Sequence, residues 1–200
     1  MKKLVTFGCA CAMAMGSAAV SAYEKDDVLL RFGAASVFPD DTNANAGVSV
    51  DGNTQLGLNV VYMASDNVGF ELLAASPFTH DVKLNGDTIG ETKQLPPTVS
   101  MQWYFNNNSI VTPYLGVGFN YTFFWDSKAG LGGDVQDVNL KDSFGFAANA
   151  GLDIEVADNW LVNASVYKMQ METEVLNGPL KGTGVTIDPV VVMLSAGYKF

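Results

Sequence analysis

The sequence predicts an all-β protein: a closed, antiparallel, eight-stranded transmembrane β-barrel with short periplasmic turns and long extracellular loops. Three observations predict it: an export signal at the amino terminus, apolar residues spread by alternation, and an aromatic carboxy-terminal strand. The chain has 200 residues, of which 48% are hydrophobic and only 16% charged. This is an apolar composition for a soluble domain of that size. No apolar run after residue 22 reaches 18 residues, so we expect no spanning helix.

The first 22 residues are typical of a cleaved secretory signal. Lys2 and Lys3 give the charged start, residues 4–15 the apolar stretch, and Val20-Ser21-Ala22 a small-residue cleavage site. We therefore expect a signal peptide over residues 1–22 and a barrel domain over residues 23–200.

Charge and cysteine content exclude several classes of function. Both cysteines, Cys9 and Cys11, lie inside the signal, so we expect no disulfide and no cysteine-based metal site. Without Lys2 and Lys3, 9 basic residues face 21 acidic ones, a net charge of −12. Because phosphate binding needs a basic surface, nucleic acid is not an expected partner.

Turn signals divide the mature chain into eight strands. Short Asn-, Asp- and Ser-rich turns at 64–67, 106–109 and 157–159 alternate with long polar connections at about 39–53, 76–94, 126–141 and 173–184. The predicted strands are 27–38, 54–63, 68–75, 95–105, 110–124, 142–156, 160–172 and 185–200. Most reach the length of roughly 9–11 residues that a tilted spanning strand needs, and the third could extend to residue 81.

The last strand shows the alternation clearly. One of its faces is apolar throughout and carries Val190, Val192, Leu194, Ala196, Tyr198 and Phe200. An even strand number with short turns on one side is the pattern of outer-membrane barrels, whose closure leaves no sheet edge in lipid. A soluble lipocalin-type barrel would place the apolar face inward, but the opposite faces are too rich in Gly, Ala and Ser for a solvated surface.

With the aromatic faces outward, the lumen divides into two zones. Near the periplasm we expect a polar network of Arg31, Asn59, Glu71, Gln102, Asn149, Asp153, Glu155 and Lys199. Because an eight-stranded barrel is just wide enough to be filled by side chains, these charges must be paired. The network is either a gate or a structural plug.

Nearer the extracellular side the inward positions become apolar and rich in methionine. They are Val37, Leu73, Phe124, Tyr167, Met169, Met171, Val191 and Met193, with Leu56 nearby if the register of its strand is shifted. Such a mouth is either a site for a small apolar ligand, to which methionines adapt, or ordinary packing between strand ends.

Catalytic and metal chemistry are not indicated. His80 is the only histidine, and we expect it to be a solvated loop residue without a nucleophile that it could activate. The loop pairs Asp40–Asp41 and Asp134–Asp137 lack the spacing of an EF-hand. We therefore expect no enzyme, no cofactor and no metal.

Several segments resemble the outer membrane protein W (OmpW) family of Gram-negative bacteria. They are NTQLGL at 53–58, YMASDN at 62–67, ELLAA at 71–75, LPPT at 95–98, QWYF at 102–105, LKDS at 140–143, DNWLVN at 158–163 and SAGYKF at 195–200. The resemblance covers essentially the whole mature chain. It implies an outer-membrane barrel with a narrow lumen that binds or passes small hydrophobic molecules. It also implies that Tyr198 and Phe200 belong to the signal read by the barrel assembly machinery.

The partners expected are therefore outer-membrane lipid, a small apolar ligand and, during biogenesis, the assembly machinery. An alternative is a non-transport envelope protein whose loops bind partners such as a bacteriocin or a phage, or support envelope integrity. The sequence does not indicate an oligomeric state.

Overall fold

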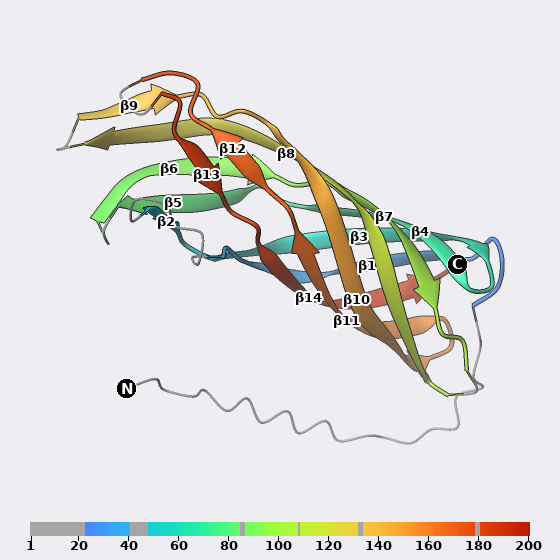
Figure 1. The fold of residues 1–200 in the computed structure, drawn as a ribbon. Helices are drawn as coiled ribbons and strands as arrows, with labels where there is room; N and C mark the ends of the chain where they lie inside the picture. Colours follow the sequence, from blue (N-terminus) through green and yellow to red (C-terminus); the bar gives the residue numbers. More distant parts are fainter. Residues whose placement is uncertain (1–22, 41–47, 85–86, 108, 132–133, 179–180) are drawn as a thin grey trace, which may run out of the picture.

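The computed structural model describes residues 23–40, 48–84, 87–107, 109–131, 134–178 and 181–200. The predicted signal peptide, residues 1–22, lies outside these ranges. Eight long antiparallel strands form a closed barrel (Figure 1). They are β1 (Val28–Phe38), β3 (Asn53–Ser65), β4 (Val68–Ala75), β7 (Thr98–Tyr104), β8 (Val111–Leu131), β10 (Ser143–Ala157), β11 (Trp160–Met169) and β14 (Val190–Lys199). The first strand pairs with the last and β8 pairs with β10, so the ring has no open edge.

The barrel is polar inside and apolar outside. Arg31, Glu71 and Gln102 are buried in its interior, whereas Phe32, Val117 and Leu194 expose 58–62% of their surface on the outer face. Soluble proteins bury apolar and expose polar side chains, so this arrangement fits a barrel whose outer face contacts lipid. It contradicts the lipocalin-type alternative. No helix among the described residues is long and apolar enough to cross a membrane.

Six short strands extend the barrel at the end opposite the carboxy terminus (Figure 1). They are β2 (Val48–Val50), β5 (Phe78–Leu84), β6 (Asp87–Leu95), β9 (Asp134–Val138), β12 (Glu172–Glu174) and β13 (Gly184–Thr186). Five of them lie wholly or mostly in the long connections that the sequence indicated as polar loops, whereas β13 lies at the start of the predicted last strand, whose barrel part, β14, begins only at Val190. The β5–β6 hairpin and β9 both pair with the outer part of β8.

Two further details of the strand prediction are wrong. Strand β4 ends at Ala75 and does not continue to residue 81, because residues 78–84 form β5 and pair with β6. Strand β8 runs to Leu131, well past the predicted end at residue 124. Both differences have one cause, which is that the sheet continues beyond the membrane as the extracellular extension.

Candidate functional site

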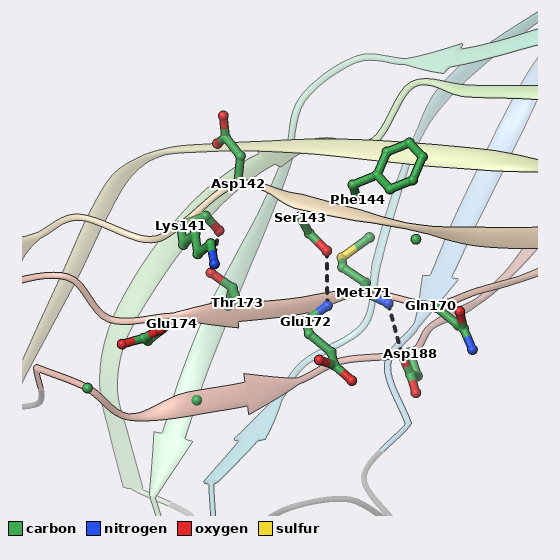
Figure 2. A pocket seen from close by; sticks show the side chains of 13 residues that line it. Lys141, Asp142, Ser143, Phe144, Gln170, Met171, Glu172, Thr173, Glu174 and Asp188 are labelled. Atoms are coloured by element: carbon green, nitrogen blue, oxygen red, sulfur yellow. Dashed lines mark hydrogen bonds between the residues drawn. The ribbon is translucent and has the colours of Figure 1, made fainter.

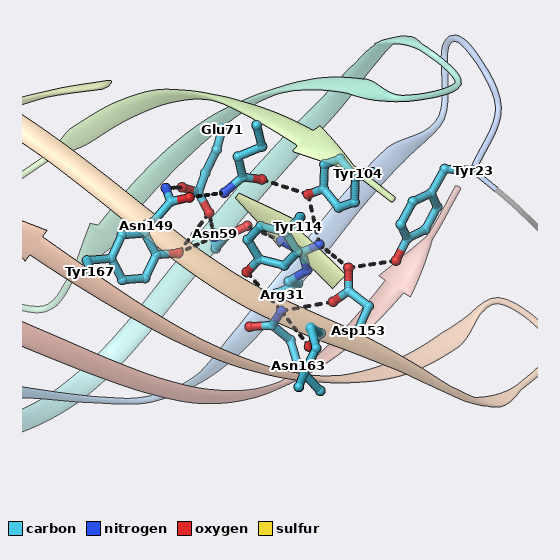
Figure 3. A network of polar contacts seen from close by, with 12 residues as sticks. Tyr23, Arg31, Asn59, Glu71, Tyr104, Tyr114, Asn149, Asp153, Asn163 and Tyr167 are labelled. Atoms are coloured by element: carbon cyan, nitrogen blue, oxygen red, sulfur yellow. Dashed lines mark hydrogen bonds and ion pairs between the residues drawn. The ribbon is translucent and has the colours of Figure 1, made fainter. Parts of the chain in front are cut away.

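The periplasmic half of the lumen is closed by a network centred on an ion pair (Figure 3). Arg31 on β1 and Asp153 on β10 are both buried, and Arg31 Nη2 lies 2.5 Å from Asp153 Oδ2. The Tyr23 hydroxyl donates to the same carboxylate oxygen at 2.7 Å, and Asn163 Nδ2 donates to the other at 2.9 Å. The guanidinium also lies over the ring of Tyr114, 5.3 Å from its centroid. The predicted pairing of these charges is therefore present.

Tyr23 approaches this network from outside the strands. It precedes β1, yet only 3% of its surface is exposed, and its ring packs edge-on against Tyr104 at 5.1 Å. Asn106 holds the Tyr23 carbonyl, and Asp66 accepts from the Lys25 amide, so the turns fix the segment across the periplasmic end. No pattern in the sequence indicated that this tyrosine would lie in the lumen.

Glu71 on β4 forms the second centre of the network. Its carboxylate accepts hydrogen bonds from Asn59 Nδ2, Tyr167 Oη, Ser100 Oγ and Asn149 Nδ2. No cation of the described residues forms an ion pair with it, so four neutral donors solvate a buried carboxyl group.

The two centres are joined into one structure. Arg31 Nη1 donates to Asn59 Oδ1 at 3.3 Å, and Asn59 in turn donates to Glu71. On the other side, Arg31 Nη2 donates to Tyr104 Oη at 3.1 Å, and that hydroxyl donates to Gln102 Oε1 at 2.6 Å. Moving a solute through this zone would break buried charge-assisted bonds, which are among the stronger ones in proteins. The network of Arg31, Asp153, Glu71 and their partners therefore closes the lumen at this depth, and we call it the floor.

Apolar side chains pack above Glu71 and complete the floor. Six of the predicted mouth residues lie in one buried cluster with Ala35, Phe78 and Ala147; they are Val37, Leu73, Tyr167, Met169, Val191 and Met193. Each has at most 5% of its surface exposed, so the cluster is tightly packed in the conformation described. Their role in ligand binding stays a prediction.

A cavity of about 70 Å³ lies above this cluster, inside the extracellular extension. Of the predicted mouth residues, Phe124 lines it. Most of its wall is apolar and comes from the segments expected to be polar loops, including Val82, Ile89, Val138 and Val175. Phe78 connects the two zones, because it belongs to the packed cluster and stacks on His80 in the cavity wall.

His80 is buried, contrary to the prediction of a solvated loop residue. Only 1% of its surface is exposed, because its strand β5 is covered by the rest of the extension. Nδ1 lies 2.6 Å from the Asp51 carbonyl oxygen, and Nε2 lies 2.9 Å from Gln94 Nε2. Burial lowers the pKa of the imidazole, although the Asp51 carbonyl and the charges of Asp51 and Asp81 act in the opposite direction.

A second, larger space of about 780 Å³ opens through the barrel wall beside the cavity (Figure 2). It lies between residues 141–145 at the start of β10 and residues 170–174 around β12. Met171, one of the predicted mouth residues, is buried in its lining. Thr173 lines both this crevice and the cavity, so the two spaces adjoin at this residue.

Three predicted site residues lie elsewhere. Leu56 exposes 71% of its surface on the outer face, which contradicts its placement in the lumen. The reason is that β3 keeps an unbroken register against β1 from Asn53 to Tyr62. This register fixes whether each side chain of β3 points into the lumen or to the outer face. Glu155 is half-buried near the periplasmic end, and Lys199 forms an ion pair with Asp27 at 3.7 Å.

The predicted assembly signal lies on the outer face of the last strand. Tyr198 packs edge-on against Trp160 at 5.1 Å and against Phe200 at 4.7 Å. Phe200 exposes 68% of its surface. Recognition of these residues by the assembly machinery stays a prediction.

Comparisons with known proteins agree with this architecture. The model of the OmpW family matches residues 24–200. Outer membrane protein W of Vibrio cholerae is 42% identical to this chain, and the match covers 96% of this chain and 97% of that protein. The crystal structure of the outer membrane protein OprG from Pseudomonas aeruginosa superposes with a TM-score of 0.77 at 35% identity, covering 90% of this chain and 98% of that one.

A more distant relative has a name that refers to an apolar compound. It is the dibenzothiophene metabolism operon protein PahQ of Pseudomonas aeruginosa, 25% identical over 74% of this chain and 72% of that protein. The family model, the relative from Vibrio cholerae and the fold agree on one assignment. This chain belongs to the OmpW family and is an eight-stranded barrel of the bacterial outer membrane.

Proposed function

We propose that this protein captures small hydrophobic molecules in its extracellular cavity and releases them sideways into the membrane. One observation carries the proposal: an apolar cavity lies above a closed polar floor and adjoins, at Thr173, a crevice in the barrel wall. An apolar wall with few polar groups is the usual character of a small-molecule site.

The floor makes passage along the barrel axis unfavourable. An apolar molecule that moved down from the cavity would have to separate Arg31 from Asp153 and remove donors from Glu71. Leaving a buried charge without its partners costs several kcal/mol, and an apolar solute offers no replacement. The sideways route avoids this cost.

The barrel wall is weak where the crevice lies. The regular ladder between β10 and β11 begins at the pair Ala147–Met169, with one further backbone bond from Gln170 to Phe146. Beyond it, two of the contacts across the gap depend on side chains: Glu172 N donates to Ser143 Oγ at 3.0 Å, and Thr173 Oγ1 donates to the Lys141 carbonyl at 2.7 Å. Two backbone bonds follow, from Lys141 N to the Glu174 carbonyl and from Leu176 N to the Asn139 carbonyl. Rotation of a few side chains would widen this gap without unfolding a strand.

The name of PahQ supports an apolar solute, because dibenzothiophene is a fused aromatic compound. That relative matches this chain in sequence over 72% of its own length. The chemistry of the cavity wall here, with Val82, Ile89 and Phe124, suits the same broad class of molecule.

A disulfide across the gap tests the sideways route. Residues 23–200 contain no cysteine, so Ser143→Cys with Thr173→Cys, whose native side chains are both buried on the two sides of the gap, would introduce one reversible cross-link there. In Gram-negative cells that lack their own OmpW protein, uptake of naphthalene should fall about fivefold or more under oxidising conditions. Addition of a reductant should restore it.

A matched cross-link serves as control. Ser36 and Thr54 face each other on β1 and β3 with their hydroxyl oxygens 2.8 Å apart, away from the crevice. The pair Ser36→Cys with Thr54→Cys should leave uptake unchanged in both redox states. Equal uptake by the oxidised and reduced 143–173 variant would contradict sideways release, and absence of naphthalene binding to the purified wild type would contradict the capture site.

A second candidate function is supported by exposed apolar residues on the extension. Val135 on β9 exposes 56% of its surface and Leu176 exposes 46%, and both lie in extracellular segments. We infer that they could contact a protein partner such as a bacteriocin or phage. Deleting residues 126–141 would not separate the two functions, because Ser127, Ala129 and Val138 line the cavity. Val135→Ser with Leu176→Ser should reduce partner binding and leave naphthalene uptake intact.

A further inference from the structure

The cavity wall is not uniformly apolar. Four buried polar side chains form one patch on its inner surface, each with at most 5% of its surface exposed: His80 on β5, Thr92 and Gln94 on β6, and Ser127 on β8. His80 faces Thr92 directly in the register of the hairpin, and Thr92 reaches across to Ser127. Burying four polar groups in a wall made largely of valine and isoleucine is unfavourable unless they have partners.

The hydrogen bonds of His80 fix the orientation of its neighbour. A carbonyl oxygen can only accept, so Nδ1, which contacts the Asp51 carbonyl, carries the proton. In the neutral ring Nε2 is then an acceptor, and it receives a bond from Gln94 Nε2 at 2.9 Å. The carboxamide of Gln94 is thus held with its nitrogen toward His80.

The oxygen of the same carboxamide remains available to a ligand in the cavity. Gln94 is 98% buried and lines the cavity, yet among the described residues no donor reaches its Oε1. The neighbouring hydroxyls do not supply one, because Thr92 Oγ1 and Ser127 Oγ bond to each other at 2.7 Å, and Ser127 also reaches the Trp125 carbonyl. The patch therefore offers a ligand one fixed acceptor in apolar surroundings.

We propose that Gln94 Oε1 is a head-group site and that the ligand is a small amphiphile with one hydrogen-bond donor, such as an alcohol or an undissociated acid. The donor would bond to Gln94 while the hydrocarbon part packs against Val82, Ile89 and Phe124. This inference rests on the proposed capture of apolar molecules and defines their class. Sites that hydrogen-bond a ligand hydroxyl discriminate strongly against analogues that lack it, because the buried protein group is then left unpaired.

Two isomeric ligands test the proposal on the whole mature protein in lipid nanodiscs. 1-Octanol carries a donor, whereas heptyl methyl ether has the same atoms but can only accept. After correction for partition into the lipid, 1-octanol should bind about tenfold more tightly, the discrimination expected for one buried hydrogen bond. Binding of the two isomers with equal affinity would overturn the head-group site but leave the capture of apolar molecules standing. Binding of neither isomer would contradict the proposed function itself.

Variants of the cavity wall locate the effect. Gln94→Leu keeps the approximate shape and should bring the two affinities within twofold of each other, with binding of the ether preserved. Thr183→Val removes a hydroxyl from the same cavity outside the patch and should keep the wild-type ratio. A Gln94→Leu protein that keeps the tenfold preference would refute the assignment.

A measurement on the unaltered protein makes the test independent of folding of the variant. The side-chain amide of Gln94 gives its own NMR signals, and these should shift on addition of 1-octanol and stay in place with the ether. Absence of a shift at saturating 1-octanol would equally refute the proposal.

Discussion

Asp153→Asn should be strongly destabilising, because it removes the only charged partner that the described residues provide for a fully buried arginine. The carboxylate of Asp153 accepts from Arg31, Tyr23 and Asn163 at 2.5–2.9 Å. An asparagine keeps one acceptor oxygen but no charge, and the remaining partners of the guanidinium, Asn59 and Tyr104, are neutral.

The magnitude follows from what breaking a buried pair costs. Removing one partner typically destabilises a protein by about 3–5 kcal/mol, and the retained oxygen of asparagine places the expected loss near the lower figure, about 3 kcal/mol. Arg31→Met combined with Asp153→Asn removes the orphaned charge as well. The double variant should therefore be more stable than Asp153→Asn alone, by about 2 kcal/mol.

Equilibrium unfolding by urea in lipid vesicles, followed by tryptophan fluorescence and by gel mobility, measures these free energies. Asp158→Asn is the matched control, because Asp158 is exposed in the β10–β11 turn and its change should stay within about 0.5 kcal/mol. A loss below about 1 kcal/mol for Asp153→Asn, or a double variant no more stable than the single one, would refute this account of the floor.

Three further outcomes are expected. Because burial lowers the pKa of His80 below its ordinary value of 6.5, the unfolded chain binds a proton that the folded one does not. Stability of the extension should therefore fall as pH drops below about 6.5, seen as faster amide exchange in β5, and His80→Phe should flatten this dependence. Gly118→Ala should block assembly, read by gel mobility, because a Cβ there would overlap the Val99 carbonyl, whereas Gly57→Ala meets only side chains and should fold. Tyr167→Phe removes one of the four donors to Glu71 and should cost about 1–3 kcal/mol of unfolding free energy, measured by the same urea titration.

The part of the fold inside the membrane could be predicted from the sequence, because lipid outside and a polar floor inside impose opposite chemistry on alternate residues. Arg31, Glu71 and Asp153 were predicted as a lumen network for this reason, and they are buried together. The partners of Glu71 could not be derived, because hydrogen bonds between strands far apart in the chain depend on the closure of the barrel.

The extension could not be predicted by the same rule. Outside the membrane the outer face of each strand meets water, so β5 and β6 carry Asp81, Lys83 and Lys93 outward and resemble polar loops. Their inward residues do alternate, as Phe78, His80 and Val82 show. That alternation was the available signal for the cavity, and it was obscured by the charges on the opposite face.

For the proposed capture and release, the length of β8 sets where the cavity would meet its ligand. This strand has 21 residues, whereas a tilted strand crosses a bilayer with about 9–11, so roughly half of it stands in water with the cavity wall attached. A molecule that enters leaves water at a gain of about 0.8 kcal/mol per buried methylene group, and in the bilayer it loses the rest of its contact with water. Water, cavity and bilayer thus form a descending series of free energy, and transfer needs no energy source. A cavity that bound more tightly than lipid would stop this flow, so modest affinity is the property expected of a working conduit.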